Sequence, residues 1–250
     1  MKCNNLSNAA IKKFIKKYDH IFGKKLTKKF NYSRVVSLAN FKFLIDNLKL
    51  NNQKNVGVIS GSTNDPELKF IKYEKISYLN FPQNKIYDLD KNWKKQKKKH
   101  FSLIICNQVL EHVFNPHLAF KNMLHHLKKG GHIYISLPTL NCIHGEPYFY
   151  SSGFHPRFLE RIAKENNLSI INIGYWGSKK YLAQAVMGHW LAERDLRPLP
   201  FSFKSFLNLS NPLLFFTDGR KCNNHNKKNR FFNKTPIITD CWGLFRKTNY

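Results

Sequence analysis

FSLIICNQVLEHV, residues 101–113, changes from apolar to polar half way along. Its first six residues are too few for a helix and are rich in β-branched and aromatic types, so they predict a strand buried on both faces. Polar side chains follow at once, at Asn107, Gln108, Glu111 and His112. Ligands of open α/β sheets bind in the crevice outside the carboxyl ends of the strands, which makes these side chains the first candidates for a functional site.

The residues after this stretch predict a helix and a second strand. Asn115 can cap a helix, and Pro116 suits its first turn. One apolar stripe follows at helical spacing, formed by Phe120, Met123, Leu124 and Leu127. Lys128 and Lys129 suit the last turn, Gly130 and Gly131 would end the helix, and HIYISLP at 132–138 reads as a strand. A strand–helix–strand unit of this kind predicts a parallel sheet.

The sequence of these three elements resembles a known family. FSLIICNQVLEHV followed by NPHLAFKNMLHHLKKGGHIYISLP is similar to the fourth strand, the next helix and the fifth strand of class I S-adenosylmethionine-dependent methyltransferases, in which LEH and LKKGG recur. The resemblance extends over about Asn55–Lys179 and returns in CWGLFRK at 241–247. It implies S-adenosylmethionine as the cofactor and an α/β fold. That fold is a Rossmann-like, seven-stranded, mostly parallel sheet flanked by helices, with the last strand antiparallel.

The remaining elements follow from local pattern. Strands are predicted at 55–61, 75–81, 85–90, 168–177 and 237–247, and helices at 7–18, 33–50 and from His155 to about Asn167. We therefore expect residues 1–50 to form helices that pack on a methyltransferase domain of residues 51–250. Within that domain, 139–167 would cap the substrate and 191–235 would form a basic excursion.

The resemblance also implies which residues bind the cofactor. The position of the glycine-rich loop is occupied by Ser60, Gly61 and Ser62, and the position of the ribose-binding residue by Asn80. The residues that contact adenine correspond to Asp88 and Leu89. The end of the fourth strand carries Asn107 and Gln108. Only one glycine of the loop is present, and Val58 stands where an acidic residue is usual. A degenerate domain that binds or scaffolds without turnover is therefore an alternative.

The segment after residue 138 is unusually aromatic. Gly145, Pro147 and Gly153 disfavour regular structure, and aromatic side chains are numerous for a solvated loop. The resemblance implies that this segment caps the substrate, with Tyr148, Tyr150 and His155 as candidate contacts. Alternatively, the aromatic side chains simply pack the loop onto the sheet.

Methyl transfer requires alignment of donor and acceptor, and a base where the acceptor is a hydroxyl. His112 is the first candidate for the base, with Glu111 as its partner, while His144 and His155 are rivals. The alternative for His112 is a histidine at a helix entry, bonded to backbone. Some relatives bind a divalent ion through E-x-x-E-H, but here Gln108 replaces the first carboxylate, so we predict no metal.

Composition limits the partners. The net charge of +27 would suit a polyanion, but lysines are spread along the chain, which favours biased residue usage over a nucleic-acid site. The resembled enzymes that methylate amino groups of DNA carry an N/D-P-P-aromatic loop after the fourth strand, and those that methylate a base carbon carry a Pro-Cys pair. This chain has neither motif, which disfavours both classes. We expect a small-molecule or sugar acceptor, methylated at oxygen or nitrogen. A ribose-directed RNA enzyme is an alternative.

Cysteine usage and hydropathy bear on location. The five cysteines are odd in number and show no C-x-x-C spacing, which favours a reducing compartment. There is no apolar h-region near the start and no apolar run of the roughly 20 residues that span a bilayer. We therefore expect a cytoplasmic protein without an integral membrane segment.

Overall fold

A computed structural model describes residues 6–21, 26, 30, 32–79, 85–141, 144–145, 147–177 and 238–248. Its helices are α1 (Asn8–Tyr18), α3 (Tyr32–Asn47), α4 (Pro116–His126) and α5 (Pro156–Glu165). Its strands are β1 (Asn52–Ile59), β2 (Lys72–Leu79), β3 (Phe101–Asn107), β4 (Leu127–Pro138), β5 (Leu168–Trp176) and β6 (Asp240–Lys247). The predictions for Asn80 and for the excursion at 191–235 lie outside the described residues.

The six strands form one mixed sheet in the order β2-β1-β3-β4-β6-β5. β1 pairs in parallel with β2 and β3, and β3 pairs in parallel with β4. β6 is antiparallel and lies between β4 and β5. The Rossmann-like fold and the antiparallel last strand are therefore confirmed, whereas seven strands are not found within the described ranges.

The missing strand is the one predicted at 85–90. Lys85–Tyr87 form a short 3₁₀ helix, and a turn follows in which Asp88 Oδ1 accepts a hydrogen bond from the amide of Asp90 at 3.0 Å. The Asp88 carbonyl also accepts a bond from the Trp93 indole at 2.7 Å. Side-chain bonds to nearby backbone compete with strand pairing, which explains why an alternating pattern became a turn here.

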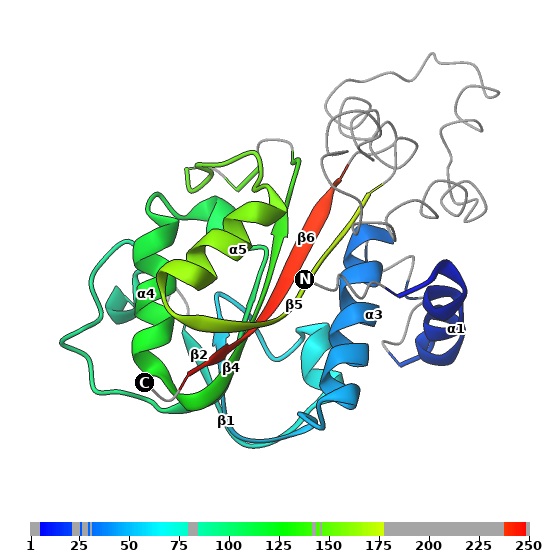
Figure 1. The fold of residues 1–250 in the computed structure, drawn as a ribbon, viewed down its shortest axis with the longest axis horizontal. Coiled ribbons are helices and arrows are strands. Elements are labelled where there is room, and N and C mark those ends of the chain that lie inside the picture. The colour runs from blue at the N-terminus through cyan, green and yellow to red at the C-terminus, as the bar shows by residue number, and fades with distance from the viewer. Residues whose placement is uncertain are drawn as a thin grey trace.

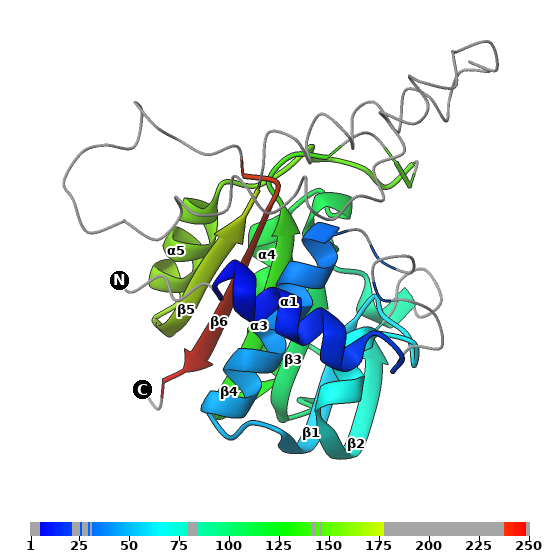
Figure 2. The same ribbon diagram turned by 90° about the vertical axis from the view of Figure 1, so that its right-hand side faces the viewer.

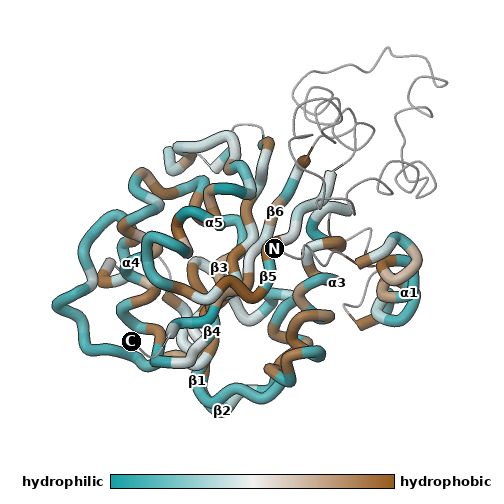
Figure 3. The backbone as a smooth tube through the Cα atoms, in the orientation of Figure 1, coloured by the Kyte–Doolittle hydropathy of each residue, from teal (hydrophilic) through white to brown (hydrophobic). Residues whose placement is uncertain are grey.

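Alternate residues of β3 face two separate hydrophobic cores. Ile104 and Cys106 belong to the core that contains Phe120 of α4, while Leu103 and Ile105 belong to the core on the α3 side. All of these side chains are at most 1% exposed. The strand is therefore buried on both faces, as predicted, and Figure 3 shows the hydrophobic colouring concentrated along the central strands.

Helices cover both faces of the sheet. Figure 1 shows α4 and α5 on one side and α3 on the other, and Figure 2 shows α1 crossing the outer side of α3. The predicted helix starts are confirmed: Ser7 Oγ caps α1 through the amide of Ala10, and Asn115 Oδ1 caps α4 through the amide of Leu118. Among the described residues, no helix is both long enough and apolar enough to cross a membrane.

α4 ends earlier than predicted. It stops at His126, and the following residues already belong to β4, where Leu127 pairs with Phe101. A Cβ at Gly131 would lie 2.9 Å from the Lys128 carbonyl oxygen and 3.0 Å from that of Phe101. Gly131 therefore permits a close backbone approach inside the sheet rather than a helix stop.

Candidate active site

A cavity of about 550 Å³ opens where β1 and β3 end. Its lining consists of Ser60, Asp88, Leu89, Asp90, Gln108, Val109, His112, Val113, Gly145, Tyr148 and Tyr150. This is the carboxyl edge of two neighbouring parallel strands, where ligands of such sheets bind. The position agrees with the crevice predicted from the sequence.

Both strands leave the sheet through a left-handed residue that lines the cavity. Ser60 follows β1 with φ 49°, and Gln108 follows β3 with φ 52°. Their amides stay bonded to neighbouring strands, to Leu79 O at 3.1 Å and to Ser136 O at 2.9 Å. A residue other than glycine rarely adopts this conformation, and such residues cluster at functional sites.

The predicted cofactor loop, residues 60–65, makes close contacts between its own residues. A Cβ on Gly61 would lie 2.2 Å from Asp65 Oδ2 and 2.3 Å from Val58 Cγ1, so a larger residue would force these side chains to shift. The amide of Ser62 donates to Asp65 Oδ1 at 3.1 Å. Ser60 lines the cavity, while Gly61 and Ser62 shape the loop without lining it.

The predicted adenine-contacting pair lines the same cavity. Leu89 is buried, and the Asp88 carboxylate forms an ion pair with Lys91 at 3.2 Å. Asp90, which the sequence reasoning missed, accepts hydrogen bonds from the amides of Phe114 and Asn115 at 3.1 and 2.7 Å. It thereby holds the start of α4 beside the cavity. The only available signal was the repeated acidic residue in YDLD.

The side chains at the end of β3 have different roles. Gln108 Nε2 donates to Asp240 Oδ1 of β6 at 3.1 Å, and burial raises the pKa of Asp240 to about 8. Asn107 Oδ1 accepts from the Ser136 hydroxyl at 3.2 Å and does not line the cavity. The structure therefore brings Gln108 into the candidate site but turns Asn107 toward β4.

Glu111, His112 and His144 lie close together, and of the three only His112 lines the cavity. His112 Nδ1 lies 2.5 Å from the carbonyl oxygen of Tyr148, and its Nε2 lies 4.0 Å from Glu111 Oε1. The His112 and His144 rings are nearly perpendicular, with centroids 4.8 Å apart. Burial raises the pKa of Glu111 to about 7. The backbone bond of His112 is the one that the structural alternative predicted, yet the ring also lines the cavity.

Aromatic side chains form the outer rim. Tyr148 and Tyr150 line the cavity and are 42% and 50% exposed. Phe114, which the sequence reasoning missed, is 76% exposed and stands edge-on to Tyr150 with centroids 5.6 Å apart. His155 is not part of the rim, because its Nδ1 caps α5 by accepting from the amide of Arg157 at 3.1 Å.

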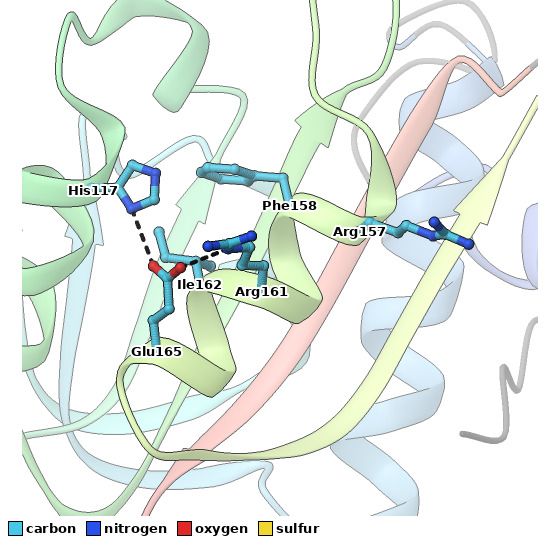
Figure 4. A pocket seen from close by; sticks show the side chains of 6 residues that line it. All are labelled: His117, Arg157, Phe158, Arg161, Ile162 and Glu165. Atoms are coloured by element: carbon cyan, nitrogen blue, oxygen red, sulfur yellow. Dashed lines mark hydrogen bonds and ion pairs between the residues drawn. The ribbon is translucent and has the colours of Figure 1, made fainter.

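A second cavity of about 420 Å³ lies against α5 (Figure 4). His117 and Glu165 face each other across it at 3.7 Å, and Arg161 also pairs with Glu165 at 2.7 Å. None of the residues predicted to bind cofactor or substrate lines this cavity. The candidate active site is therefore the first cavity.

One protein family matches the part of the chain that contains these cavity residues. A family model described as a methyltransferase domain matches residues 50–176, which include β1, β3 and the cavity residues they carry. Comparison with curated proteins found no match.

Solved structures similar to this chain include several methyltransferases. The 1,6-didemethyltoxoflavin-N1-methyltransferase of Burkholderia thailandensis, solved with S-adenosylhomocysteine, is 7% identical over 96% of this chain and 88% of its own, with a TM-score of 0.47. The N-methyltransferase NodS of Bradyrhizobium japonicum was also solved with S-adenosylhomocysteine. It is 12% identical over 93% of this chain and 97% of its own, with a TM-score of 0.47.

The [4+2]-cyclase SpnF is 11% identical over 99% of this chain and 98% of its own, with a TM-score of 0.47. The match to the methyltransferase-domain model spans more than half of the 250 residues and contains the strand ends that form the cavity. The chain therefore belongs to the family of S-adenosylmethionine-dependent methyltransferases.

Proposed function

We propose that the chain methylates a neutral or cationic small molecule, such as an amine or a sugar hydroxyl, in the cavity at the ends of β1 and β3. The observation that carries this proposal is that the described lining holds no cationic side chain that could pair with an anionic acceptor. Among the described residues, the cavity is lined by the carboxylates of Asp88 and Asp90 and by no lysine or arginine. A chain with a net charge of +27 thus presents an acidic and aromatic cavity.

The lining divides into two halves. Asp88, Leu89, Ser60 and Gln108 would bind the cofactor, with the apolar Leu89 side chain against the base and the Asp88 carboxylate as a hydrogen-bond acceptor. His112, Tyr148 and Tyr150 would bind the acceptor. When bound, S-adenosylmethionine would supply an electrophilic methyl group on a sulfonium whose leaving group is neutral.

His112 is suited to remove the acceptor proton. Because Nδ1 lies 2.5 Å from a carbonyl oxygen, this nitrogen carries the hydrogen, and Nε2 keeps its lone pair. When the methyl group is transferred, His112 Nε2 would accept the proton that the acceptor atom loses. His112 then returns the proton to solvent. An unprotonated amine acceptor could instead be methylated without this step.

The ribose-directed RNA alternative predicts a different lining. Enzymes of nucleic acids neutralise phosphates with lysine and arginine, and neither residue type lines the described part of this cavity. The degenerate alternative draws support from the self-closed loop at Gly61, where Ser62 and Asp65 bond to one another. Cofactor binding separates this alternative from the enzyme.

The test is calorimetric titration of the full chain with S-adenosylmethionine and S-adenosylhomocysteine. We expect micromolar binding that Asp88→Ala weakens by about tenfold, the loss of one charged hydrogen bond. Asp46→Ala is the matched control, because Asp46 lies on α3 and pairs with Lys42 outside the cavity. Absence of binding by folded protein would favour the degenerate alternative.

If binding is found, methyl transfer is measured with panels of amines, neutral glycosides and RNA. Turnover of an amine or a glycoside supports the proposal. Turnover of RNA alone would overturn it.

A further inference from the structure

Three segments that are far apart in the sequence bring lysine and arginine to one end of the sheet. They are residues 94–100, which precede β3, residues 128–129 near the start of β4, and residues 246–247 at the end of β6. Together they contain nine lysine and arginine residues and no aspartate or glutamate. We call the surface formed by these three segments the basic face.

Strand pairing and side-chain bonds hold the last two segments together. His132 of β4 pairs with Arg246 of β6, and Figure 1 shows the dark red end of β6 beside the start of β4. Lys247 Nζ donates to the carbonyl oxygens of Leu124 and Leu127 at 2.6 and 2.9 Å. The end of β6 is thereby fixed against the end of α4 and the start of β4.

The backbone of residues 94–100 is bonded to two neighbouring elements. His126 Nδ1 at the end of α4 accepts from the amide of Lys99 at 3.2 Å, and Asn55 Nδ2 of β1 donates to the Lys99 carbonyl oxygen at 2.7 Å. His125 Nε2 lies 3.2 Å from the carbonyl oxygen of Gln96. The five lysines of this loop are all exposed. The loop is therefore anchored through its backbone while it presents its charged side chains to solvent.

The charges of the three segments lie close to one another. Burial lowers the pKa of Lys247, and the nearby charges of Lys98 and Lys129 lower it further. These three residues belong to the end of β6, the loop before β3 and the start of β4. Cations from all three segments therefore repel one another in the folded chain, and a polyanion bound there would relieve this repulsion.

The basic face differs from surfaces where charge is compensated. Several cations elsewhere form ion pairs with a carboxylate three or four residues away. These pairs are Lys42–Asp46, Lys91–Asp88, Lys164–Glu160 and Arg161–Glu165. By contrast, the five lysines of residues 94–99 form no ion pair with any described residue. Biased residue usage explains how many lysines the chain has, but not why these three segments lack the carboxylates that offset charge elsewhere.

We propose that the basic face binds the phosphate backbone of a nucleic-acid duplex, as a docking surface separate from the methylation site. A duplex carries phosphates at close and regular spacing, and lysine side chains neutralise them. The seven residues of β3 run from the basic face to the cavity, so about 20 Å separates the two sites. The duplex would therefore hold the enzyme in place without being its methyl acceptor.

The side chains present favour a duplex over a single strand or a membrane. The apolar residues beside these segments are buried, namely Trp93, Phe101, Leu127 and Phe245. The basic face itself contains no aromatic residue that could stack on unpaired bases, which proteins that bind single strands commonly use. It also contains no apolar side chain that could enter a membrane, and stable anchoring to lipid takes more than one signal.

The experiment measures the fluorescence anisotropy of a labelled DNA duplex on titration with the full chain, between about 50 and 200 mM salt. The test variant combines Lys97→Gln, Lys98→Gln and Lys99→Gln in one chain. We expect it to weaken binding by at least about tenfold and to reduce the slope of log K against log salt by about 2–3. An RNA duplex of equal length should bind within about threefold of the DNA duplex, because lysine contacts phosphate and not base edges.

The matched control combines Lys13→Gln, Lys16→Gln and Lys17→Gln, which removes the same charge from exposed positions on α1. We expect it to weaken binding by less than about threefold, because these lysines lie outside the basic face. Equal losses in the two triple variants would show that net charge alone attracts the duplex, and would overturn the proposal.

Three further results would overturn it: no duplex binding at about 50 mM salt, tighter binding of single strands, or tighter binding of vesicles that contain phosphatidylserine. Titration of the same samples with S-adenosylhomocysteine keeps the two proposals separate. Cofactor affinity should be equal in the parent chain and in both triple variants. Duplex binding by a chain that binds no cofactor would count against the methyl transfer only.

Discussion

Gln108 and Asp240 join the ends of β3 and β6, two strands separated in the sheet by β4, across 132 positions of sequence. Gln108 Nε2 donates to Asp240 Oδ1 at 3.1 Å, at the point where β3 ends and β6 begins. The amide of Gln108 is bonded to Ser136 O of β4, so this residue is bonded to both β4 and β6. A cavity residue in a left-handed conformation is thereby fixed by the two strands that follow β3 in the sheet.

The same pair predicts how stability depends on pH. Burial raises the pKa of Asp240 to about 8. Between about pH 4 and pH 8, the Asp240 carboxyl group is therefore protonated in the folded chain and ionised in the unfolded chain. The contribution of Asp240 to stability therefore falls as pH rises through that range. The free energy of unfolding of Asp240→Asn, taken relative to the parent chain, should therefore be higher at pH 9 than at pH 5 by at least about 1 kcal/mol. Urea unfolding at both pH values measures this.

Asp46→Asn is the control for Asp240→Asn, because Asp46 is exposed on α3. It should change stability equally at the two pH values. An Asp240→Asn variant with the same effect at pH 5 and pH 9 would contradict the prediction.

His126 predicts a loss of stability in acid. Its ring is buried against Trp93, with centroids 5.5 Å apart, and burial lowers its pKa to about 4. Between about pH 6.5 and pH 4 the unfolded chain therefore binds a proton that the folded chain refuses, and stability falls as pH falls. His126→Gln should reduce this acid loss. Urea unfolding at pH 4.5 and pH 7 measures it, with His125→Gln as the neighbouring control.

The ion pair between α3 and the loop after β1 predicts a large effect on stability. Arg34 Nη2 donates to Glu67 Oε2 at 2.7 Å, and the Glu67 side chain is fully buried. Arg34→Met would leave that carboxylate unpaired and should destabilise the chain by about 3–5 kcal/mol. Lys42→Met removes the exposed pair with Asp46 on the same helix and should cost less than about 1 kcal/mol.

Denaturant midpoints of the two variants decide this prediction. The double variant Arg34→Met, Glu67→Gln should recover part of the loss, because no charge is then left buried. Equal losses in Arg34→Met and Lys42→Met would contradict the buried role of the Arg34–Glu67 pair.

Gly61 predicts a coupled effect on the loop and on cofactor binding. In Gly61→Val, the new side chain would meet Asp65 and Val58, and such overpacking costs about 1–3 kcal/mol. Because the loop begins at the cavity residue Ser60, we expect weaker S-adenosylhomocysteine binding as well. Asp46→Ala, on α3 and outside the cavity, is the control. Unchanged affinity in a folded Gly61→Val chain would argue that the loop does not contact the cofactor.

Much of the fold could be predicted because its signals are local. The apolar run of β3, the cap at Asn115 and the stripe that includes Phe120 each depend on residues within one or two turns. The strand predicted at 85–90 was wrong because KIYDLD alternates as a strand does, whereas Asp88 bonds to the amide two residues on. That competition leaves no mark in a hydropathy pattern.

The site could be predicted only in part for a similar reason. Seven residues proposed from the sequence line the cavity: Ser60, Asp88, Leu89, Gln108, His112, Tyr148 and Tyr150. The missed contributions of Asp240, Asp90 and Phe114 arise from contacts between distant segments, such as the bonds from Asp90 to the start of α4. His155 was placed in the site because of its neighbours in sequence, but its ring caps α5.

Substitution of Phe114 should affect binding of the acceptor and leave binding of the cofactor unchanged. Its side chain is 76% exposed although it is large and apolar, and its backbone is held by Asp90. Its ring and that of Tyr150 form an exposed pair at the rim of the cavity. Such a pair is suited to stack on a ring of the acceptor, or to attract a cationic amine, which is worth about 0.5–2 kcal/mol.

Phe114→Ala should therefore raise the KM for the acceptor by about threefold to tenfold while S-adenosylhomocysteine affinity stays the same. Tyr73→Ala is the control, because Tyr73 is an exposed aromatic residue on β2 that does not line the cavity. Steady-state kinetics with the acceptor identified by screening, together with calorimetry, measure both quantities. If Phe114→Ala weakened cofactor binding and left KM unchanged, the aromatic rim would belong to the cofactor half of the cavity, and the division of the lining proposed above would have to be reversed.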